Sequence, residues 1–564
     1  MPVVNVATRE NPSYLPVEAC EVVAGQPAKT KLTPNQTRGM LNFAVRPPPQ
    51  NAQSIATNGT GILGLGAPPN PTLQEFGVQP DPKLITVPGR VLPVPNVYYK
   101  DEKSGQKQVR PNFGSWNMRS IRFSTSTKMT SWTYLVVDFE GRRPFFDSPA
   151  ALAGPLKRFT DKLNEVGVIS APFKPGSRVE VNEMNYEAVI DSAIARLIAG
   201  HRPQVILTIL PSVDTGLYNC IKQTCDIKHG VRNVNVLGDK FAKCDDQYFA
   251  NVGLKFNLKL GGNNQVLRAS DLGLIGEGKT MLVGLDVTHP SPGSSDNAPS
   301  VAGMVASVDA LLGQWPAEIR VQREKRNEMV EDLNAMLKAH LQRWQRGHKS
   351  QLPENIIVYR DGVSEGQYDK VVEKELPLLK AACKETYPAT DTAKQLPRIS
   401  IVVVGKRHHT RFYPTSDSTA DRSGNPSNGT VVDRGVTEAR NWDFFLQAHT
   451  ALKGTARPAH YYTVWDEIFL RQKPSPPNQN TADILEGLTH RLCYLFGRAT
   501  KAVSICPPAY YADLVCTRAR CYLSSAFDPT PSGSIVTGSG GADVQVDDAS
   551  VRIHGNVKDT MFYI

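Results

Sequence analysis

The chain has 564 residues, of which 40% are hydrophobic and 21% charged, and its formal net charge is +10 at pH 7. This length predicts two or three domains that each bury a core, and the composition is typical of globular protein. No apolar run approaches the roughly 20 residues of a membrane-spanning helix, and the N-terminus lacks the basic and apolar stretches of a secretory signal. We therefore expect no membrane partner. The excess of positive charge favours a polyanionic partner.

Nine cysteines are scattered along the chain without paired CxxC spacing. An odd number of unpaired cysteines indicates reduced thiols in a cytosolic or nuclear protein and no structural zinc. We therefore expect a cytoplasmic location.

The first 110 or so residues are rich in Pro, Asn and Gly, and NAQSIATNGTGILGLGAPPNP (51–71) predicts a flexible linker. From Trp116 onward, strand and helix patterns alternate. The predicted strands are 131–139 and 203–211, and the predicted helices are 149–167 and 187–199. This alternation predicts an α/β domain with a parallel sheet.

A second series of elements begins with a predicted strand at 280–287. It continues with a long helix around 320–345, strands at 355–361 and 398–406, and helices near 482–497 and 508–523. We place the boundary between the two series near Gly261-Gly262.

Two of these strands end in an aspartate, Asp286 in GLDVTHP and Asp361 in YRDGVSEGQ. Groups at strand ends of an open α/β sheet cluster in space, so both could reach one site. Carboxylates suit Mg²⁺ or Mn²⁺, and two such ions can support phosphodiester hydrolysis. The alternative is that each aspartate only caps a helix or starts a turn.

A second candidate site combines an aromatic ring with lysines. Tyr218 and Lys222 are four apart on a predicted helix and share one face. Lys255 and Lys259 in FNLKLGG also share a face if that segment is a strand. A ring beside an ammonium can stack a base while the ammonium meets phosphate. The alternative is that each lysine is an ordinary surface cation.

The segments GLDVTHP, YRDGVSEGQ, KRHHTR, GTARPAHY and PPAYYADLVCTRARCYL resemble, in order, the PIWI motifs of eukaryotic Argonautes. The sequences of these motifs most resemble those of filamentous-fungal Argonautes that act in quelling. The resemblance implies an α/β fold: a MID domain with a Rossmann-like parallel sheet, followed by a PIWI domain with a ribonuclease H-like fold. The implied domains are 1–40 (end of PAZ and start of the second linker), 41–110 (linker L2), 111–262 (MID) and 263–564 (PIWI). The N domain and nearly all of PAZ are then expected to be missing.

The resemblance also implies roles for particular residues. The catalytic residues are Asp286, Glu328, Asp361 and Asp513, and Asp286, Asp361 and Asp513 bind Mg²⁺ or Mn²⁺. Glu328 is placed only by the match of RNEMVEDL, because its charged surroundings are otherwise typical of a solvated helix face. Residues that bind the guide 5′ phosphate are Tyr218, Lys222, Lys255, Lys259 and Arg518. Residues that contact guide or target backbone are Arg407, His409, Arg457, Arg498, Ser504 and Tyr510.

Two positions depart from the family pattern. Val234 stands where the phosphate pocket of relatives has Gln, so a neighbouring Asn or backbone amides must supply that donor. Phe496 stands where animal members often have Tyr. Asp513 and Arg518 are five apart, about 140° around a helix, so one helix could serve both sites from different faces.

The resemblance implies a small-RNA-guided endoribonuclease that anchors a guide RNA by its 5′ phosphate and cuts complementary target RNA with Mg²⁺. Further silencing cofactors are expected as partners. The alternative is a guide-binding silencing scaffold that does not cut. An unguided nuclease of ribonuclease H type is disfavoured, because it leaves the Tyr218 and lysine set without a purpose.

Overall fold

The computed structural model describes residues 3–8, 11–21, 23–25, 32–66, 68, 70–81, 83–101, 103–291, 294–295, 298–324, 326–388, 396–474, 476, 478–527 and 546–564. The chain forms two compact units, Met1–Arg46 and Pro47–Ile564. The smaller unit contains antiparallel strands β1 (Val3–Asn5) and β2 (Tyr14–Pro16), the short helix η1 (Val17–Ala19) and helix α1 (Pro34–Ala44). Thr33 and Gln36 cap the start of α1 reciprocally.

The larger unit begins with helix where a flexible linker was predicted. Helices α2 (Pro48–Gln53), η2 (Ser54–Gly59) and α3 (Thr60–Ile62) follow one another without a break, and α4 (Pro71–Glu75) comes next. The prediction is therefore wrong for residues 51–62. Pro48 sits in the first turn, where its fixed φ favours helix, and Asn51 donates to the Tyr413 hydroxyl at 2.9 Å.

The first large sheet has four parallel strands in the order β7-β6-β8-β9. Apolar side chains alternate along them, so each face carries its own core. Helices α5 and α9 cover one face with Phe159 and Phe256, and α6 and α7 cover the other with Ile194 and Ile221. The bounds are β6 (Trp132–Phe139), α5 (Pro149–Glu165), β7 (Ser177–Val181), α6 (Tyr186–His201), β8 (Val205–Leu210), α7 (Thr215–Gln223), η3 (Thr224–Lys228), β9 (Arg232–Leu237), α8 (Gly238–Phe241) and α9 (Asp246–Lys259).

The second large sheet has nine strands in the order β12-β11-β10-β13-β14-β17-β16-β15-β3. Parallel pairing joins β10 to β13 and β13 to β14, and the other neighbouring strands of this sheet pair antiparallel. The strands are β3 (Arg90–Val91), β10 (Thr280–Thr288), β11 (Val301–Ala306), β12 (Ala317–Val321), β13 (Asn355–Asp361), β14 (Arg398–Gly405), β15 (Thr430–Val432), β16 (Asp443–Gln447) and β17 (Ala459–Asp466). An antiparallel hairpin, β4 (Val97–Asp101) and β5 (Gly105–Val109), lies in the segment that joins β3 to the four-stranded sheet.

Helices cover both faces of the nine-stranded sheet. One face packs against α10 (Leu333–Gly347) and α12 (Leu376–Thr386), and the other against α14 (Thr481–Leu492) and α15 (Pro507–Tyr522). The shorter helices are η4 (Ala269–Ile275), η5 (Glu365–Gln367), α11 (Tyr368–Lys370), η6 (Val371–Glu375), η7 (Asp417–Thr419), η8 (Phe469–Arg471), α16 (Ser524–Phe527) and η9 (Asp548–Val551).

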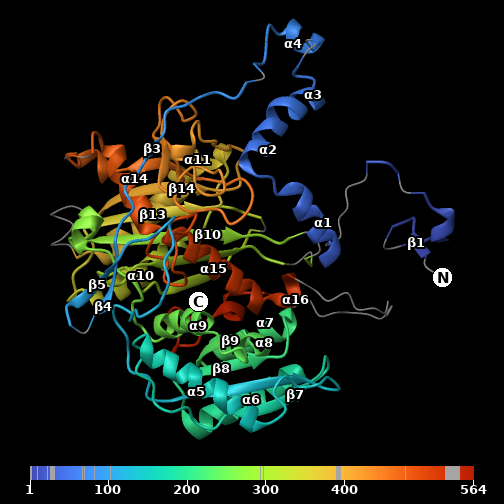
Figure 1. Cartoon of the computed structure of the whole chain (residues 1–564), viewed down its shortest axis with the longest axis vertical. Coiled ribbons are helices and arrows are strands. Elements are labelled where there is room, and N and C mark those ends of the chain that lie inside the picture. Colours follow the sequence, from blue (N-terminus) through green and yellow to red (C-terminus); the bar gives the residue numbers. More distant parts are fainter. Residues whose placement is uncertain are drawn as a thin grey trace. The chain divides into compact units, whose positions relative to one another are not determined.

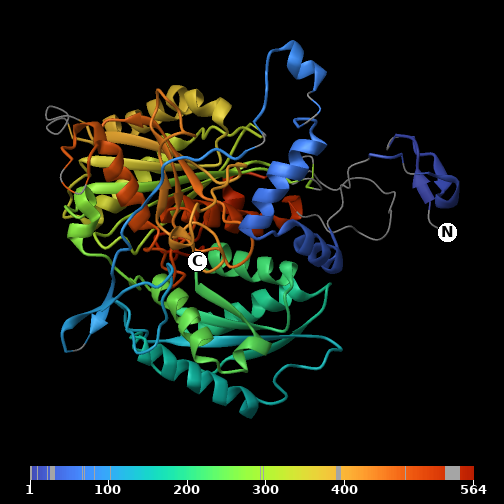
Figure 2. The same cartoon turned by 45° about the horizontal axis from the view of Figure 1, so that its top comes forward.

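Helix α15 lies between the two large sheets (Figure 1, Figure 2). It approaches β10 and β11 closely at two glycines. A Cβ on Gly284 would lie 1.9 Å from the Pro508 carbonyl oxygen, and one on Gly303 would lie 3.0 Å from Cys516 Sγ. This close approach holds α15 directly over the end of β10.

The structure confirms the predicted α/β class and most elements of both series, including the strand that ends at Asp361 and strand β10, which carries Asp286 and continues to Thr288. The predicted helix at 320–345 is wrong in its first half. Residues 317–321 form the edge strand β12, a loop follows, and α10 begins only at Leu333. The loop contains Arg326 at φ 58°, a left-handed conformation that a helix does not allow.

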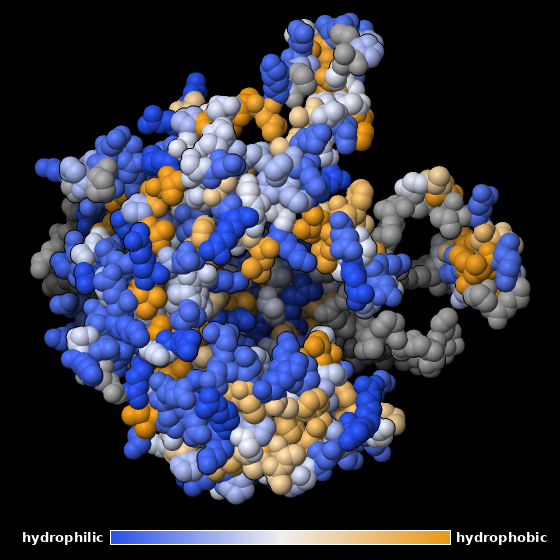
Figure 3. Space-filling model, in the orientation of Figure 1, coloured by the Kyte–Doolittle hydropathy of each residue, from blue (hydrophilic) through white to orange (hydrophobic). Residues whose placement is uncertain are grey.

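Hydrophilic residues cover most of the larger unit's face in Figure 3. None of the helices in the described ranges has the length and apolar run that crossing a bilayer requires.

Candidate active site and candidate phosphate pocket

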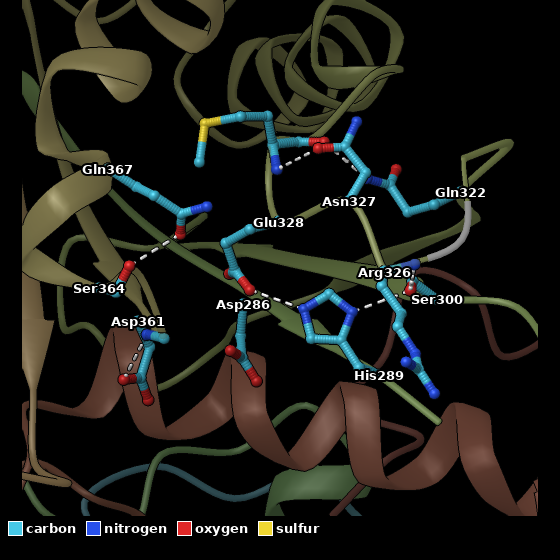
Figure 4. A network of polar contacts seen from close by, with 12 residues as sticks. Asp286, His289, Ser300, Gln322, Arg326, Asn327, Glu328, Asp361, Ser364 and Gln367 are labelled. Carbon is cyan, nitrogen blue, oxygen red and sulfur yellow. Dashed lines mark hydrogen bonds and ion pairs between the residues drawn. The ribbon is translucent and has the colours of Figure 1, made fainter. Parts of the chain in front are cut away.

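Asp286 and Asp361 meet at the ends of two neighbouring parallel strands. Leu285 of β10 pairs with Arg360 of β13, so the next residue on each strand falls beside the other. Asp286 and Asp361 alternate with Leu285 and Arg360, which places both on the face covered by α15. Figure 4 shows the two carboxylates and that of Glu328 side by side near this helix.

Glu328 reaches the same place from the loop before α10. Its Oε2 contacts His289 Nε2 at 2.7 Å, and its Oε1 lies 3.1 Å from Arg360 Nη1. The Arg360 guanidinium also donates to the Glu328 carbonyl oxygen. Glu328 is therefore held by Arg360 on β13 and by His289, which directly follows β10.

The carboxylates raise one another's pKa. Burial raises the pKa of Asp286 to about 6, Arg360 opposes the rise, and Asp513 and Glu328 add to it. Burial together with Asp286 and Asp513 holds the pKa of Asp361 well above its usual range. Such mutual destabilisation of negative charge is relieved by a bound cation.

Asp513 belongs to this group through its position on α15. Its side chain is more exposed than that of Asp286, and partial burial raises its pKa while Arg407 opposes the rise. Its charge contributes to the raised pKa of both Asp286 and Asp361. Asp286, Glu328 and Asp361 therefore come together, and Asp513 lies near enough for its charge to act on the two aspartates.

There is room between these acids. Gly362 follows Asp361 at φ 88°, and a Cβ added there would lie 3.2 Å from Asp286 Oδ1 and 3.4 Å from Glu328 Oε1. A side chain at this position would fill the space between the carboxylates. Oxygen ligands around an open space are the donor set that Mg²⁺ and Mn²⁺ prefer.

The sequence analysis missed His289 and Arg360. His289 also contacts the Ser300 hydroxyl at 2.8 Å through Nδ1, and Arg360 is fully buried against Glu375. His289 lies in GLDVTHP and Arg360 in YRDGVSEGQ. Their closeness in sequence to Asp286 and Asp361 is the one feature of the sequence that could have indicated them. Their contacts with Glu328 depend on the tertiary fold.

Another cluster of three carboxylates, Asp433, Asp483 and Glu486, is close enough to ligate a metal. The Arg90 guanidinium of β3 already contacts all three. This cluster therefore fastens β3 and its linker to the sheet, and we assign it no catalytic role.

The second site is a cavity of about 240 Å³ between α7, β9, α9, α15 and the chain end. Four of the five residues predicted to bind a 5′ phosphate line it: Tyr218, Lys222, Lys255 and Arg518. The C-terminal residues Tyr563 and Ile564 also line it. Arg518 thus lines the cavity, whereas Asp513, five residues earlier on α15, does not.

Arg518 ties the two halves of the cavity together. Its guanidinium donates to Asp226 Oδ2 at 2.7 Å, to the Tyr218 hydroxyl at 3.2 Å and to two carbonyls of the chain end. The Lys222 ammonium lies 5.5 Å from the centre of the Tyr218 ring. Helix α7, helix α15 and the C-terminus are therefore held as one cationic pocket.

The lysines differ in their bonding. Lys222 Nζ donates to Asn233 Oδ1 at 2.6 Å, whereas Lys255 has no hydrogen-bond partner among the described residues. Burial, together with Arg518 or Arg498 nearby, lowers the pKa of both lysines to about 8. Lys255 and Lys259 lie on helix α9 rather than a strand, and share a face because they are one turn apart.

Lys259 does not line the cavity. It is fully buried, burial holds its pKa well below the usual range, and its ammonium donates to the Phe562 carbonyl. In this structure it holds the chain end in place beneath the pocket, so direct phosphate contact by Lys259 stays a prediction.

Asn235 occupies the part of the pocket where the sequence analysis left a donor in doubt. It lines the cavity next to Val234, and both its amide nitrogen and oxygen are buried without a hydrogen-bond partner. Asn233, by contrast, is committed to Lys222 and to Thr208. An unpaired buried amide at the cavity wall is a ready contact for a polar ligand.

The predicted backbone-contact residues lie near both sites. Arg407, His409 and Arg457 are exposed, and the Ser504 hydroxyl accepts from Lys406. Tyr510 stacks on Phe496, with ring centres 4.5 Å apart. Arg498 lines the phosphate cavity itself, so it acts with the pocket more than with the exposed cations.

Comparison with known proteins agrees with this geometry. The Piwi domain profile matches residues 205–524, and the Argonaute linker 2 profile matches residues 50–99. Protein argonaute 5 of Arabidopsis thaliana and protein argonaute MEL1 of Oryza sativa are each 34% identical over all of this chain, which covers 55% and 53% of their lengths. The chain thus spans about half the length of the curated relatives it matches.

Solved structures show the same similarity. Kluyveromyces polysporus Argonaute with a guide RNA superposes with a TM-score of 0.80 at 26% identity, covering 100% of this chain and 62% of that one. The MID-PIWI domains of N. crassa QDE-2 are 32% identical with a TM-score of 0.56, covering 78% and 100%. The chain therefore belongs to the Piwi-domain family and is a eukaryotic Argonaute.

Proposed function

We propose that the chain is the part of a small-RNA-guided endoribonuclease that anchors the guide 5′ phosphate and cuts the paired target RNA. The observation that carries the proposal is the double use of α15. One part of this helix carries Asp513, whose charge acts on Asp286 and Asp361, and another places Arg518 in the cavity of about 240 Å³. We call the group of Asp286, Glu328, Asp361 and Asp513 the acidic edge. RNA anchored by its 5′ end in the cavity would reach this edge at a fixed distance along the strand.

In the pocket, Lys222, Lys255 and Arg518 provide charge for the guide phosphate, and Tyr218 provides a ring for the first base. Asn235 supplies the side-chain contact that Val234 cannot make. Arg407, His409 and Arg457 hold backbone phosphates, which fixes register without reading sequence.

At the acidic edge, Asp286, Asp361 and Asp513 would hold divalent cations, and Glu328 would complete the oxygen ligands. Bound Mg²⁺ would supply an activated water and neutralise the charge that develops on the phosphodiester. His289 and Arg360 orient Glu328 toward this position.

Incubation of the purified chain with a 5′-phosphorylated guide and a labelled complementary target, in Mg²⁺ or EDTA, tests the proposal. We expect one Mg²⁺-dependent cut at a fixed distance from the guide 5′ end. Guide binding without cleavage would favour a silencing scaffold, and cleavage that ignores the guide would contradict the proposal.

A further inference from the structure

A third cavity, distinct from both sites, is strongly basic. It has a volume of about 830 Å³, more than three times that of the phosphate pocket. Five cationic residues line it, and none of its lining residues is acidic: Lys107, Arg110, Arg119, Arg422 and Lys501. We call this cavity the basic groove.

Lys107 donates to the Ser120 carbonyl at 2.6 Å, and the other four cations of the groove are open to a ligand. No ion pair to any of the five is found within the described part of the chain, and Arg110, Arg119, Arg422 and Lys501 are exposed. Like charges repel unless a polyanion or salt screens them. Since 54 acidic residues are distributed over the chain, a groove of this size lined without one is suited to phosphates.

The groove also presents an aromatic ring on a fixed backbone. Phe113 lies in the left-handed region at φ 48° with its side chain exposed. Thr450 Oγ1 donates to its carbonyl at 2.8 Å, and the Arg422 guanidinium lies 4.4 Å from its ring centre. Phe113 and Gly114, at φ 70°, are the two central residues of a tight turn that pairs Asn112 with Ser115, and this turn presents the Phe113 ring at the groove.

The floor of the groove is tied to the second large sheet. The Gly114 carbonyl accepts from the Ala502 amide at 2.7 Å, and the Trp116 amide donates to the Thr500 carbonyl at 3.0 Å. The Trp116 ring stacks on Tyr494. The segment after β5 and the segment before α15 therefore form one rigid surface.

The groove adjoins the proposed RNA path. Lys501 precedes Ser504 by three residues, and Thr450 directly follows His449. Burial, with Lys406 and Lys501 nearby, lowers the pKa of His449 to about 3, and Lys406 donates to the Ser504 hydroxyl.

We propose that the basic groove binds the sugar–phosphate backbone of single-stranded RNA and stacks one base on Phe113. The proposal rests on the proposed function, because RNA is the ligand in both. A chain of phosphates matches the spread of five cations, and an exposed ring beside an arginine is the usual platform for a base.

The test compares the variant Arg110→Ala/Arg119→Ala/Lys501→Ala with a control, Lys157→Ala/Arg196→Ala/Lys374→Ala, that removes the same charge from exposed residues elsewhere. The probe is fluorescein-labelled oligouridine with a 5′ phosphate or a 5′ hydroxyl, titrated at several salt concentrations. We expect the groove variant alone to bind about tenfold more weakly and to lower the slope of log affinity against log salt by about 2. Uridine 5′-monophosphate should bind both variants equally.

A second variant separates stacking from charge. Phe113→Asn keeps a residue that tolerates the left-handed backbone and removes the ring. We expect weaker oligouridine binding by about fivefold with an unchanged salt slope.

Groove variants that match the control in affinity and slope would overturn the proposal and favour an acidic or phosphorylated protein as the occupant. Failure of the proposed function would look different. In that case the groove would still bind oligouridine, but the unsubstituted chain would show no preference for the 5′-phosphorylated probe, and Lys222→Ala would affect both probes equally.

Discussion

The phosphate pocket and the acidic edge are electrostatic opposites built by the same physics. In the pocket, burial lowers the pKa of Lys222 and Lys255 to about 8. At the acidic edge, burial and neighbouring carboxylates raise the pKa of Asp286 to about 6. Each site gathers like charges where water is scarce, so each favours a ligand of the opposite sign: a phosphate in one and a divalent cation in the other.

The two sites differ in how many of their charged side chains already have a partner within the protein. In the pocket, Arg518 is paired with Asp226 and Lys222 is bonded to Asn233 before a ligand arrives. At the edge, Arg360 contacts Glu328, while Asp286 has no ion pair within the described residues. The pocket is thus preorganised by its own bonds, whereas the edge depends more on an added ion. Four predictions test this difference.

The largest effect is expected at the acidic edge. Asp286→Asn should lower cleavage by at least about a thousandfold, because a neutral amide cannot replace a charged metal ligand. Affinity for the guide should stay within about twofold, since the pocket is untouched. Single-turnover cleavage and guide titration measure the two, with Asp369→Asn as the exposed control. Retained Mg²⁺-dependent cleavage in Asp286→Asn would remove this residue from the site.

Next comes loss of charge in the pocket. Lys222→Met/Lys255→Met should lower the affinity for 5′-phosphorylated RNA about a hundredfold, because both ammonium groups face the phosphate. The affinity for 5′-hydroxyl RNA should fall much less. Lys255→Met alone is the safer variant, since Lys255 holds no structural hydrogen bond. Fluorescence anisotropy with both RNAs gives the ratio. Equal losses for the two RNAs would show a general basic patch instead.

A smaller effect distinguishes the two asparagines of β9. Asn235→Ala should lower the affinity for 5′-phosphorylated RNA about tenfold. It should leave the free energy of unfolding unchanged or raise it by about 1 kcal/mol, because the substitution removes an unpaired buried amide. Asn233→Ala should lower the free energy of unfolding by about 2 kcal/mol, since it breaks the bonds to Lys222 and Thr208. Urea unfolding and anisotropy check both. Stability lost in Asn235→Ala would show that this amide is structural.

The smallest effect is that of pH on the pocket. With the pKa of Lys222 and Lys255 at about 8 in the free protein, affinity for 5′-phosphorylated RNA should fall about threefold between pH 7 and pH 8 and more steeply above. The free energy of unfolding changes in the opposite sense. Both lysines bind protons more tightly in the unfolded chain, so their contribution to stability rises from about pH 8 toward the unfolded pKa. Lys255→Met should flatten both profiles, and unchanged profiles would contradict the lowered pKa.

Local pattern was enough for much of the fold. Apolar runs of five to nine residues predicted the central strands, and their carboxyl ends predicted that Asp286 and Asp361 would meet. Helical spacing predicted the shared face of Tyr218 and Lys222. Such features depend on neighbours within one or two turns, which the sequence displays directly.

Only the tertiary structure decided the rest. Charge pattern predicted a helix around Glu328, but an edge strand and loop place it between His289 and Arg360. Lys259 matched a phosphate ligand, but the chain end, about 300 residues later, takes its ammonium. The free amide of Asn235 and the basic groove each depend on segments far apart in the chain. Periodicity reports which face of an element is buried, whereas the partner on that face is set by packing between distant segments.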